Sequence, residues 1–313
     1  MRPLALIPLA AAALLLSAAA GTAGTSAPVA LVTAETSNEV YAVSPASGHV
    51  VRRVHLADPV TITGRPGRLA VVVDTNGPVT LLDPVTLRAV ETFRFRSPQI
   101  AAYSADGSLV YVTDAASGDL AVIDPTRHRV VRRVFVGRGA HHIAVSPDGR
   151  HIWVALGETA TTIVRLDATS PRAPRVVGRF HPHVASHDLV FAPDGRSVWV
   201  SSATAPLVSV YSPSGRLTAT VPAGRAPQHL AVAGDRMVVT SGYGSSLEEV
   251  SLARRRVVGS TALPYGSFNL ATWQGLVITT SLLDGDVTEL RASDLRRVWS
   301  RHVAPEARSI AIG

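Results

Sequence analysis

The chain has 313 residues, no cysteine and a formal net charge of +7, and every positive side chain other than histidine is an arginine. Without cysteine, disulfides and a lipid-modified cysteine are excluded. The basic charge favours contact with anionic cell-surface polymers, or else belongs to a solvated surface without a partner. No arginine cluster is interleaved with stacking aromatic residues, which argues against nucleic acid as a partner.

The first 27 residues predict an export signal. Arg2 is followed by an apolar stretch from Leu4 to Leu16 and then by small residues as far as Ala27, which is the order of a secretory signal peptide. The apolar stretch is shorter than the roughly 20 residues that a membrane span needs. We expect cleavage between Ala20 and Ala27 and a mature monomer, without a membrane span, that is secreted or associated with the cell wall.

An apolar run, a Pro-Asp-Gly turn and a second apolar run recur in residues 28–313. The stretch HIAVSPDGRHIWV (142–154) returns as DLVFAPDGRSVWV (188–200). In such a turn Pro fixes φ, Asp bonds its own backbone and Gly takes a positive φ. The turn glycines are spaced by 40, 42, 46, 39 and 41 residues and fall at Gly67, Gly107, Gly149, Gly195, Gly234 and Gly275. They divide the chain into seven units, and a period of about 40 residues is that of a propeller blade.

Each unit contains four predicted strands. In the clearest unit these are SLVYVTDA, GDLAVIDP, RVVRRVFVG and HHIAVSPDG, which are rich in Val and Ile and separated by turn residues. No later segment has a sustained helical period. One blade cannot bury both of its faces, so the array must close. The sequence therefore predicts an all-β single domain over 28–313, a seven-bladed β-propeller of four-stranded antiparallel blades.

The segment VYVTDAASGDLAVIDPTRHRVVRRVFVGRGAHHIAVSPDG resembles the repeat of the YVTN-type β-propellers, here of the exported bacterial type. The family's Tyr-Val-Thr-Asn tetrapeptide begins the strand after the turn, and it stands here as Tyr111-Val112-Thr113-Asp114. A WD40 array is disfavoured because no Gly-His is followed by Trp-Asp. The resemblance implies that the strand before each Pro-Asp-Gly turn is innermost and lines a central channel. It implies no single activity, because this family serves many roles.

The two ends of the repeat are predicted to share one blade. The segment ALVTAETSNEVYAV takes the place of a second strand and the strand after it, whereas EARSIAIG lines up with an inner strand and stops before its turn. We expect Ser309–Ile312 to pair as the innermost strand beside Val29–Thr33. This closure leaves no unpaired edge facing the channel.

The two residues that enter each inner strand are predicted to form a ring at one mouth of the channel. These pairs are Pro59-Val60, Pro98-Gln99, His141-His142, His187-Asp188, Gln228-His229, Phe268-Asn269 and Arg308-Ser309. The candidate ligand-binding residues are Gln99, His141, His142, His187, Asp188, Gln228, His229, Asn269 and Arg308. Neutral imidazoles beside a carboxylate suit a divalent metal ion or proton transfer. The candidate metal ligands are His142, His187, Asp188 and His229.

A purely structural alternative applies to the same histidines. The mouths of propellers are usually polar and water-filled, so these side chains can serve only to bond neighbouring carbonyl groups. His141 and His142 are expected to point to opposite faces of their strand, because neighbouring strand residues alternate. Trp153 and Trp199 occupy equivalent positions in successive units, which predicts packing between blades.

Loops on the same side of the ring are predicted to add further polar residues, which are Glu35, Asp74, Asp114, Glu158 and Tyr243. Asp74 and Asp114 both stand seven residues after a turn glycine, and we expect them to cap strand ends. His181 and His183 have chelating spacing, but no third ligand is evident for them.

Two classes of function follow. The first is an exported binding or scaffold module that holds a protein, peptide or glycan partner through its rim and channel mouth, without catalysis. The alternative is a metal-assisted lyase or hydrolase with its His and Asp residues at the mouth, similar to the streptogramin-linearising lyases, which are seven-bladed propellers that use a histidine and a divalent ion. No motif matches those enzymes residue by residue. A divalent metal ion, suggested by the histidines and the aspartate at the mouth, is the one cofactor that the sequence indicates.

Overall fold

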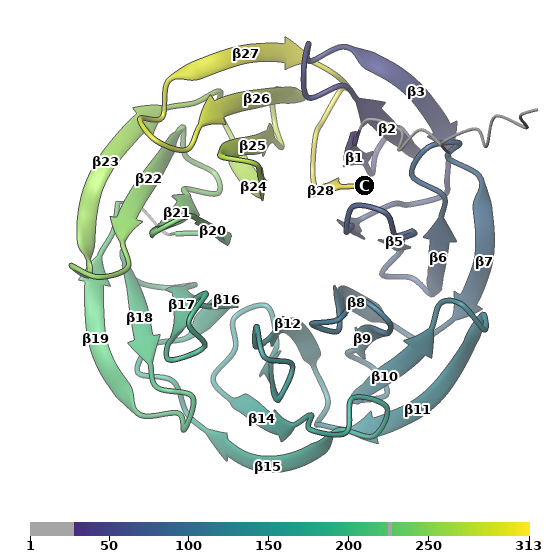
Figure 1. Ribbon diagram of the computed structural model, residues 1–313, viewed down its shortest axis with the longest axis vertical. Coiled ribbons are helices and arrows are strands. Elements are labelled where there is room, and N and C mark those ends of the chain that lie inside the picture. The colour runs from purple at the N-terminus through teal and green to yellow at the C-terminus, as the bar shows by residue number, and fades with distance from the viewer. Residues whose placement is uncertain (1–27, 225–226) are drawn as a thin grey trace, which may run out of the picture.

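The computed structural model describes residues 28–224 and 227–313, and the predicted export signal lies outside these residues. Within them, 28 strands form seven four-stranded antiparallel sheets, which stand as blades in a ring around a central channel (Figure 1). No helix in the described residues is long and apolar enough to cross a membrane. The predicted all-β, seven-bladed propeller is confirmed.

The strands are arranged from the channel outward in each blade. Blade 1 contains β28 (Ile310–Ile312), β1 (Ala30–Ala34), β2 (Glu39–Val43) and β3 (Val50–His55). Blade 2 contains β4 (Thr61–Thr63), β5 (Ala70–Val73), β6 (Pro78–Leu82) and β7 (Ala89–Arg94). Blade 3 contains β8 (Pro98–Tyr103), β9 (Val110–Asp114), β10 (Asp119–Asp124) and β11 (Arg129–Phe135). Blade 4 contains β12 (Ala140–Val145), β13 (His151–Leu156), β14 (Ile163–Asp167) and β15 (Arg175–Phe180). Blade 5 contains β16 (Ser186–Phe191), β17 (Val198–Ser202), β18 (Leu207–Tyr211) and β19 (Leu217–Pro222). Blade 6 contains β20 (Leu230–Ala233), β21 (Arg236–Thr240), β22 (Ser246–Ser251) and β23 (Arg256–Ala262). Blade 7 contains β24 (Ser267–Trp273), β25 (Leu276–Ser281), β26 (Asp286–Arg291) and β27 (Arg297–His302).

The Pro-Asp-Gly turn joins the inner strand of a blade to the second strand of the same blade. Between β12 and β13, the Ser146 hydroxyl donates to Asp148 Oδ1 at 2.6 Å and the Gly149 amide donates to the Ser146 carbonyl at 2.9 Å. Gly149 has a φ of 71°, which a residue with a Cβ resists. A repeat unit counted from its glycine therefore takes three strands from one blade and the inner strand from the next.

The hydrophobic core consists of seven clusters, one between each pair of neighbouring blades. Trp153 of blade 4 is buried against blade 5, where its ring centroid lies 6.0 Å from Phe191 and 6.2 Å from Tyr211. Trp199 is buried in the cluster between blades 5 and 6. Both tryptophans therefore pack between blades, as predicted.

Strands from the two ends of the described chain close the ring. In blade 1, β28 pairs with β1 in antiparallel register, with Ile312 opposite Ala30 and Ile310 opposite Val32 (Figure 1). The ladder continues toward the mouth, because the Thr33 amide donates to the Ser309 carbonyl at 3.0 Å. The predicted closure is confirmed, and it brings the segment before β28 to the channel mouth.

A repeated hydroxyl fastens the inner strands to one another at the mouth. The Thr113 hydroxyl, the third residue of the tetrapeptide, accepts a hydrogen bond from the Ile100 amide of its own blade at 3.2 Å. It donates to the His141 carbonyl of the next blade at 2.6 Å. Equivalent hydroxyls bridge their own inner strand and the next one at Thr33, Ser201, Thr240 and Thr280. These bonds fix the backbone from which the mouth side chains project.

Candidate functional site

The inner strands of all seven blades begin at one mouth of the channel, where they surround a cavity of about 490 Å³. Eight of the nine predicted ligand-binding residues line it, namely Gln99, His141, His142, His187, Asp188, His229, Asn269 and Arg308. The ninth, Gln228, lies beside it and bonds His187. The ring closure therefore brings together residues that are up to 209 positions apart, from Gln99 to Arg308.

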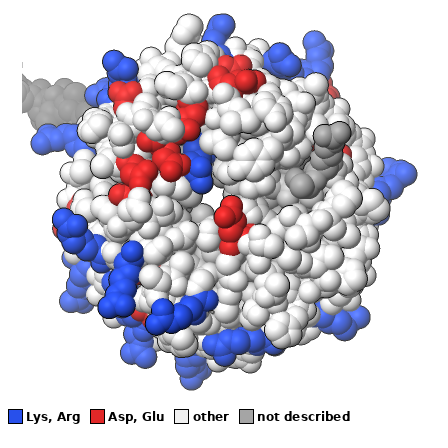
Figure 2. Space-filling model, turned by 180° about the vertical axis from the view of Figure 1, so that it is seen from behind, with Lys and Arg blue, Asp and Glu red and all other residues white. Residues whose placement is uncertain are grey.

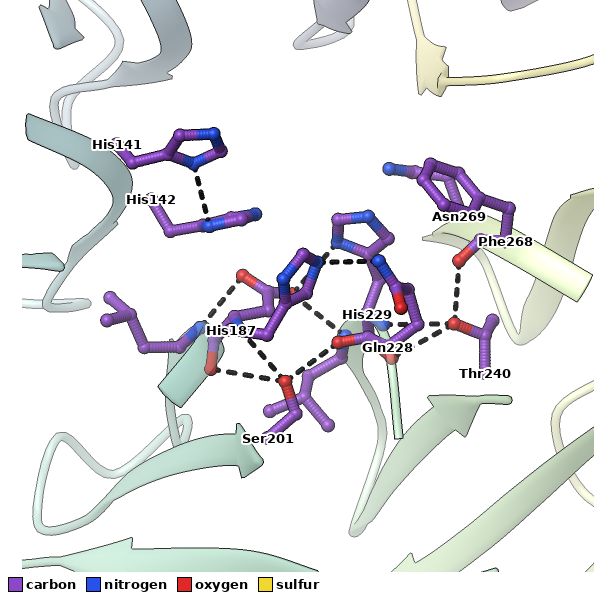
Figure 3. A network of polar contacts seen from close by, with 12 residues as sticks. His141, His142, His187, Ser201, Gln228, His229, Thr240, Phe268 and Asn269 are labelled. Carbon is purple, nitrogen blue, oxygen red and sulfur yellow. Dashed lines mark hydrogen bonds and ion pairs between the residues drawn. The ribbon is translucent and has the colours of Figure 1, made fainter. Parts of the chain in front are cut away.

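Three histidines converge on one side of this mouth (Figure 3). His142, His187 and His229 each offer one ring nitrogen, and these three nitrogens lie within 4.8 Å of one another. The ring centroids are 4.4 Å apart for His142 and His187 and 5.2 Å apart for His187 and His229. Among the described residues, this is the group of histidine and carboxylate side chains whose spacing suits a metal ion.

The Nδ1 atom of each histidine in this trio already has a partner. His142 Nδ1 lies 2.9 Å from His141 Nδ1, His187 Nδ1 lies 3.1 Å from the Glu158 carbonyl, and His229 Nδ1 lies 3.4 Å from Asp188 Oδ2. A carbonyl or a carboxylate can only accept, so Nδ1 carries the proton in His187 and His229. The lone pair of each of these rings is therefore on Nε2, which is left for another partner.

The expected opposite orientation of His141 and His142 is wrong. Their strand has a β-bulge, because Ala140 pairs with Leu156 whereas Ile143 pairs with Val154, which places one additional residue in β12. A bulge re-aims side chains away from strict alternation. The same irregularity occurs near the start of three other inner strands, β8, β16 and β24. In β12, β16 and β24 it turns both residues of the entering pair toward the mouth. In β8 the predicted pair Pro98-Gln99 is wrong by one position, because the bulge contains Gln99 and Ile100 and these two residues line the cavity.

Gln228 occupies the lone pair of one histidine. Its side-chain nitrogen lies 2.7 Å from His187 Nε2, and because His187 Nδ1 holds the proton, the amide of Gln228 is the donor (Figure 3). Gly242 lies directly behind Gln228, where a Cβ would come within 2.7 Å of Gln228 Oε1. Gly242 also has a φ of 62°, so this position favours glycine on two counts.

Burial keeps His141, His142 and His187 neutral. It lowers the pKa of His142 far below its ordinary value, and the neighbouring His187 lowers it further. Burial, together with the charge that His229 carries when protonated, lowers the pKa of His187 to about 4 and that of His141 to about 4. These rings therefore present lone pairs, not positive charges, at neutral pH.

Asp188 is a buried carboxylate behind His229. Burial would raise its pKa, but hydrogen bonds from His229 and from the Leu230 amide, at 2.9 Å to Oδ2, lower it below the ordinary value. The other oxygen accepts from the Leu189 amide at 2.8 Å. Asp188 thus crosses from blade 5 to blade 6 and holds the His229 ring in one orientation.

The opposite side of the mouth carries an arginine. Arg308 Nη1 lies 3.0 Å from Glu35 Oε2, and the guanidinium carbon lies 5.6 Å from the centre of the Phe268 ring. The ring centroid of Phe268 lies 5.3 Å from that of His229 and 6.3 Å from that of Tyr243, which meets Phe268 edge to face. One aromatic ring therefore separates the arginine from the histidines.

Among the predicted loop residues, the aspartates have structural roles. Asp114 accepts hydrogen bonds from the amides of Arg96 and Ser97 in the preceding connection, and Asp74 accepts from the Asn76 amide at 2.7 Å. Both cap strand ends, as predicted. Among the described residues no third ligand joins His181 and His183.

Some residues of the site have no predictive signal, or only a weak one. Glu158 contributes through its backbone carbonyl, which any residue type would supply. Phe268 was placed at the mouth by the repeat but not assigned to binding, although it packs between His229 and Arg308. The hydroxyls of Ser201 and Thr240 were detectable, because Ser or Thr recurs at the third position of the tetrapeptide.

Charge is distributed unevenly on the surface around this site. Figure 2 shows acidic residues gathered beside a central opening, with most arginines at the circumference. Glu35, Asp58, Asp74 and Glu306 belong to loops on the mouth side of blades 1, 2 and 7, where Glu306 accepts from the Thr36 amide at 2.7 Å. The net charge of +7 is therefore not the charge that a ligand meets at the mouth.

The fold and the site define a seven-bladed β-propeller with a histidine-lined channel mouth. No protein-family model and no curated protein sequence matches the chain. The chain is similar in fold to a functionally unknown protein from Desulfotomaculum acetoxidans, with a TM-score of 0.78 and 14% identity over 91% of this chain and 98% of the other. It is also similar to apo AztD from Citrobacter koseri, with a TM-score of 0.71 and 10% identity over 91% and 98% of the two chains. Kuenenia stuttgartiensis hydrazine synthase gives a TM-score of 0.69 and 18% identity over 81% and 89%.

These similarities establish the propeller fold and nothing finer, because the identities are low and the functions differ. The YVTN-type assignment and the export of the protein stay predictions.

Proposed function

We propose that the protein is a binding protein that holds one divalent transition-metal ion at its channel mouth through His142, His187 and His229. The observation that carries this proposal is the convergence of three ring nitrogens within 4.8 Å of one another. Imidazole nitrogen is a preferred ligand of Zn²⁺ and of its neighbours among the transition metals. Three such ligands would leave one position of a tetrahedral ion open.

The partners of the trio support this assignment. A histidine that binds a metal usually donates its other ring N–H to a carboxylate or a carbonyl group, which fixes the ring and strengthens the ligand. His229 has Asp188 in that position, and His187 has the Glu158 carbonyl. In this proposal Asp188, predicted as a fourth ligand, acts behind His229 because its oxygens are engaged with backbone amides.

Metal binding requires two small adjustments. With Zn–N bonds of about 2 Å, the nitrogens of a tetrahedral site lie about 3.3 Å apart, so the trio has to contract. The Gln228 amide also has to release His187 Nε2, which it contacts at 2.7 Å. Both are side-chain movements, and the hydroxyl-linked backbone behind them can stay in place.

The two predicted classes of function differ in what they add to this ion. A binding or scaffold protein requires only the ion, with or without a protein, peptide or glycan partner at the rim. A metal-assisted lyase or hydrolase requires in addition a substrate whose bond breaks at the open position. We favour binding, because the lone pairs and their fixed partners account for the geometry without a reacting group.

The experiment is calorimetric titration of the full-length, EDTA-treated protein with Zn²⁺. We expect one ion per chain, and a loss of affinity of about 100-fold or more in His187→Ala and in His229→Ala, because even outer-shell changes cost 10- to 100-fold. His181→Ala is the matched control, since this exposed histidine lies outside the trio. Absence of zinc binding, or equal binding by all variants with unchanged thermal midpoints, would contradict the proposal.

A further inference from the structure

We infer that the mouth binds the metal ion together with a small organic carboxylate, which occupies the open metal position and reaches Arg308. This inference rests on the proposed function and names the class of ligand that the same site takes. Its first support is size. The cavity of about 490 Å³ far exceeds the roughly 30 Å³ of one water and falls in the range of small-molecule sites.

The lining of the cavity suits an organic ligand better than an ion with its waters. Besides the histidines, it combines hydroxyl and amide groups with aliphatic side chains, namely Thr61, Thr63, Gln99, Asn269, Ile62, Ile100, Leu230 and Leu270. Polar residues form most of the lining, and the aliphatic side chains offer an apolar contact beside them, a mixture that can orient a small molecule. A metal ion alone would make no use of the aliphatic part.

Arg308 supplies the anion-binding group. Its guanidinium carries five N–H donors, of which Nη1 is paired with Glu35 Oε2 at 3.0 Å, while Nε is buried and has no hydrogen-bond partner among the described residues. The side chain keeps 32% of its surface exposed, and it lines the cavity. Its position beside the Phe268 ring holds the charge in place before a ligand arrives.

The charges favour a metal–carboxylate complex over a bare ion. Three neutral imidazoles leave the charge of a divalent ion without a counter-charge at its open position, because Asp188 lies behind His229 and Glu35 is paired with Arg308. A carboxylate bound to the ion offsets both positive charges and can form charge-assisted hydrogen bonds with the guanidinium. Phe268 lies between Arg308 and His229, so a ligand that reaches both the ion and Arg308 has to pass beside the Phe268 ring.

The test is titration of the Co²⁺-loaded full-length protein with succinate, followed by visible absorption and calorimetry. We expect succinate to change the Co²⁺ spectrum and to bind about tenfold or more tightly to the loaded protein than to the metal-free protein. The neutral diamide succinamide should do neither. Arg308→Gln should weaken succinate binding about tenfold and leave Co²⁺ affinity nearly unchanged.

Two further variants keep the outcome decisive. Glu35→Gln removes the carboxylate that competes for Arg308, so it should tighten succinate binding about threefold or more. Arg138→Gln changes an exposed arginine that bonds the Ala116 carbonyl; it is the matched control and should leave both affinities unaltered. If Co²⁺ does not bind, the proposed function and this inference both fail. If Co²⁺ binds but succinate leaves its spectrum unchanged, or binds the metal-free protein equally well, only this inference is overturned.

Discussion

Asp148 and Asp106 at the turn end of the channel and Asp188 at its mouth find their hydrogen-bond donors in different ways. At the turn end, Asp148 accepts hydrogen bonds from the Ser146 hydroxyl and the Arg150 amide of its own turn, and Asp106 does the same with Ser104 and Ser108. At the mouth, Asp188 of blade 5 is bonded to Leu230 of blade 6, 42 residues away. His187 is likewise bonded across blades, to the Glu158 carbonyl.

This difference distinguishes the turn aspartates from the polar groups of the histidine site. A group that is satisfied within its own turn can recur in every blade and needs no particular neighbour, so it serves the fold. A group that is satisfied by another blade can also recur, as the bridging hydroxyls do, but Asp188 and His187 each depend on one particular pair of blades, so these positions around the mouth differ chemically. The His187 and His229 lone pairs arise at the second kind of position.

Both ends of the channel depend on the closure of the ring, so we expect a chain that cannot close to lose the structure of both ends. Deletion of residues 307–313 removes the inner strand of blade 1 with its buried Ile310 and Ile312. We expect the free energy of unfolding to fall by about 5 kcal/mol or more, since each large buried aliphatic side chain contributes about 2–5 kcal/mol. Thermal unfolding measures the effect, with Val298→Ala on the exposed outer strand as the control. An unchanged midpoint would refute the closure.

Two aspartates at opposite ends give a matched pair of variants. We expect Asp188→Asn to weaken zinc binding about 10- to 100-fold, because it removes the charge that holds the proton of His229 on Nδ1. Asp148→Asn should leave zinc affinity unaltered, because that side chain is bonded within its own turn. Calorimetric dissociation constants for the two variants decide the matter, and equal values would remove the distinction between the ends.

Gln228 tests whether the mouth is held ready for a ligand. Its amide donates to the His187 lone pair, a hydrogen bond worth about 1 kcal/mol that metal binding has to break. Gln228→Ala should therefore tighten zinc binding about fivefold. Gln274→Ala is the control, since Gln274 is exposed in the turn between β24 and β25 at the other end of the channel. Weaker zinc binding in Gln228→Ala would instead make Gln228 part of the metal site.

The smallest effect is expected at the turn end, as a pH dependence of stability. Hydrogen bonds from Ser104 and Ser108 lower the pKa of Asp106 to about 2. A lowered pKa contributes stability that is complete above the ordinary value of about 4 and is lost as the pH falls toward 2. Because Asp106 is exposed, we expect less than about 1 kcal/mol. The free energies of unfolding of the wild type and of Asp106→Asn should differ at pH 5 and converge near pH 2. A difference that stays constant over this pH range would disprove the assignment.

The sequence by itself determined the features that repeat. A period near 40 residues, the Pro-Asp-Gly turns and the strand content predicted seven blades, and the incomplete repeats at the two ends predicted the shared blade. These features depend on interactions between residues close in the chain, such as the Ser146–Asp148 turn, or on a pattern that every blade shares. Propensity and periodicity report such interactions directly.

Only the tertiary structure decided the chemistry of the mouth. Alternation predicted that His141 and His142 diverge, but a bulge in β12 brings their Nδ1 atoms to 2.9 Å. The sequence identified His187 as a candidate, yet a backbone carbonyl in blade 4 places its lone pair on Nε2, and the Gln228 amide beside blade 6 donates to that lone pair. Such contacts join residues about 30 to 40 positions apart, so they exist only once the blades are packed, and no local pattern encodes them.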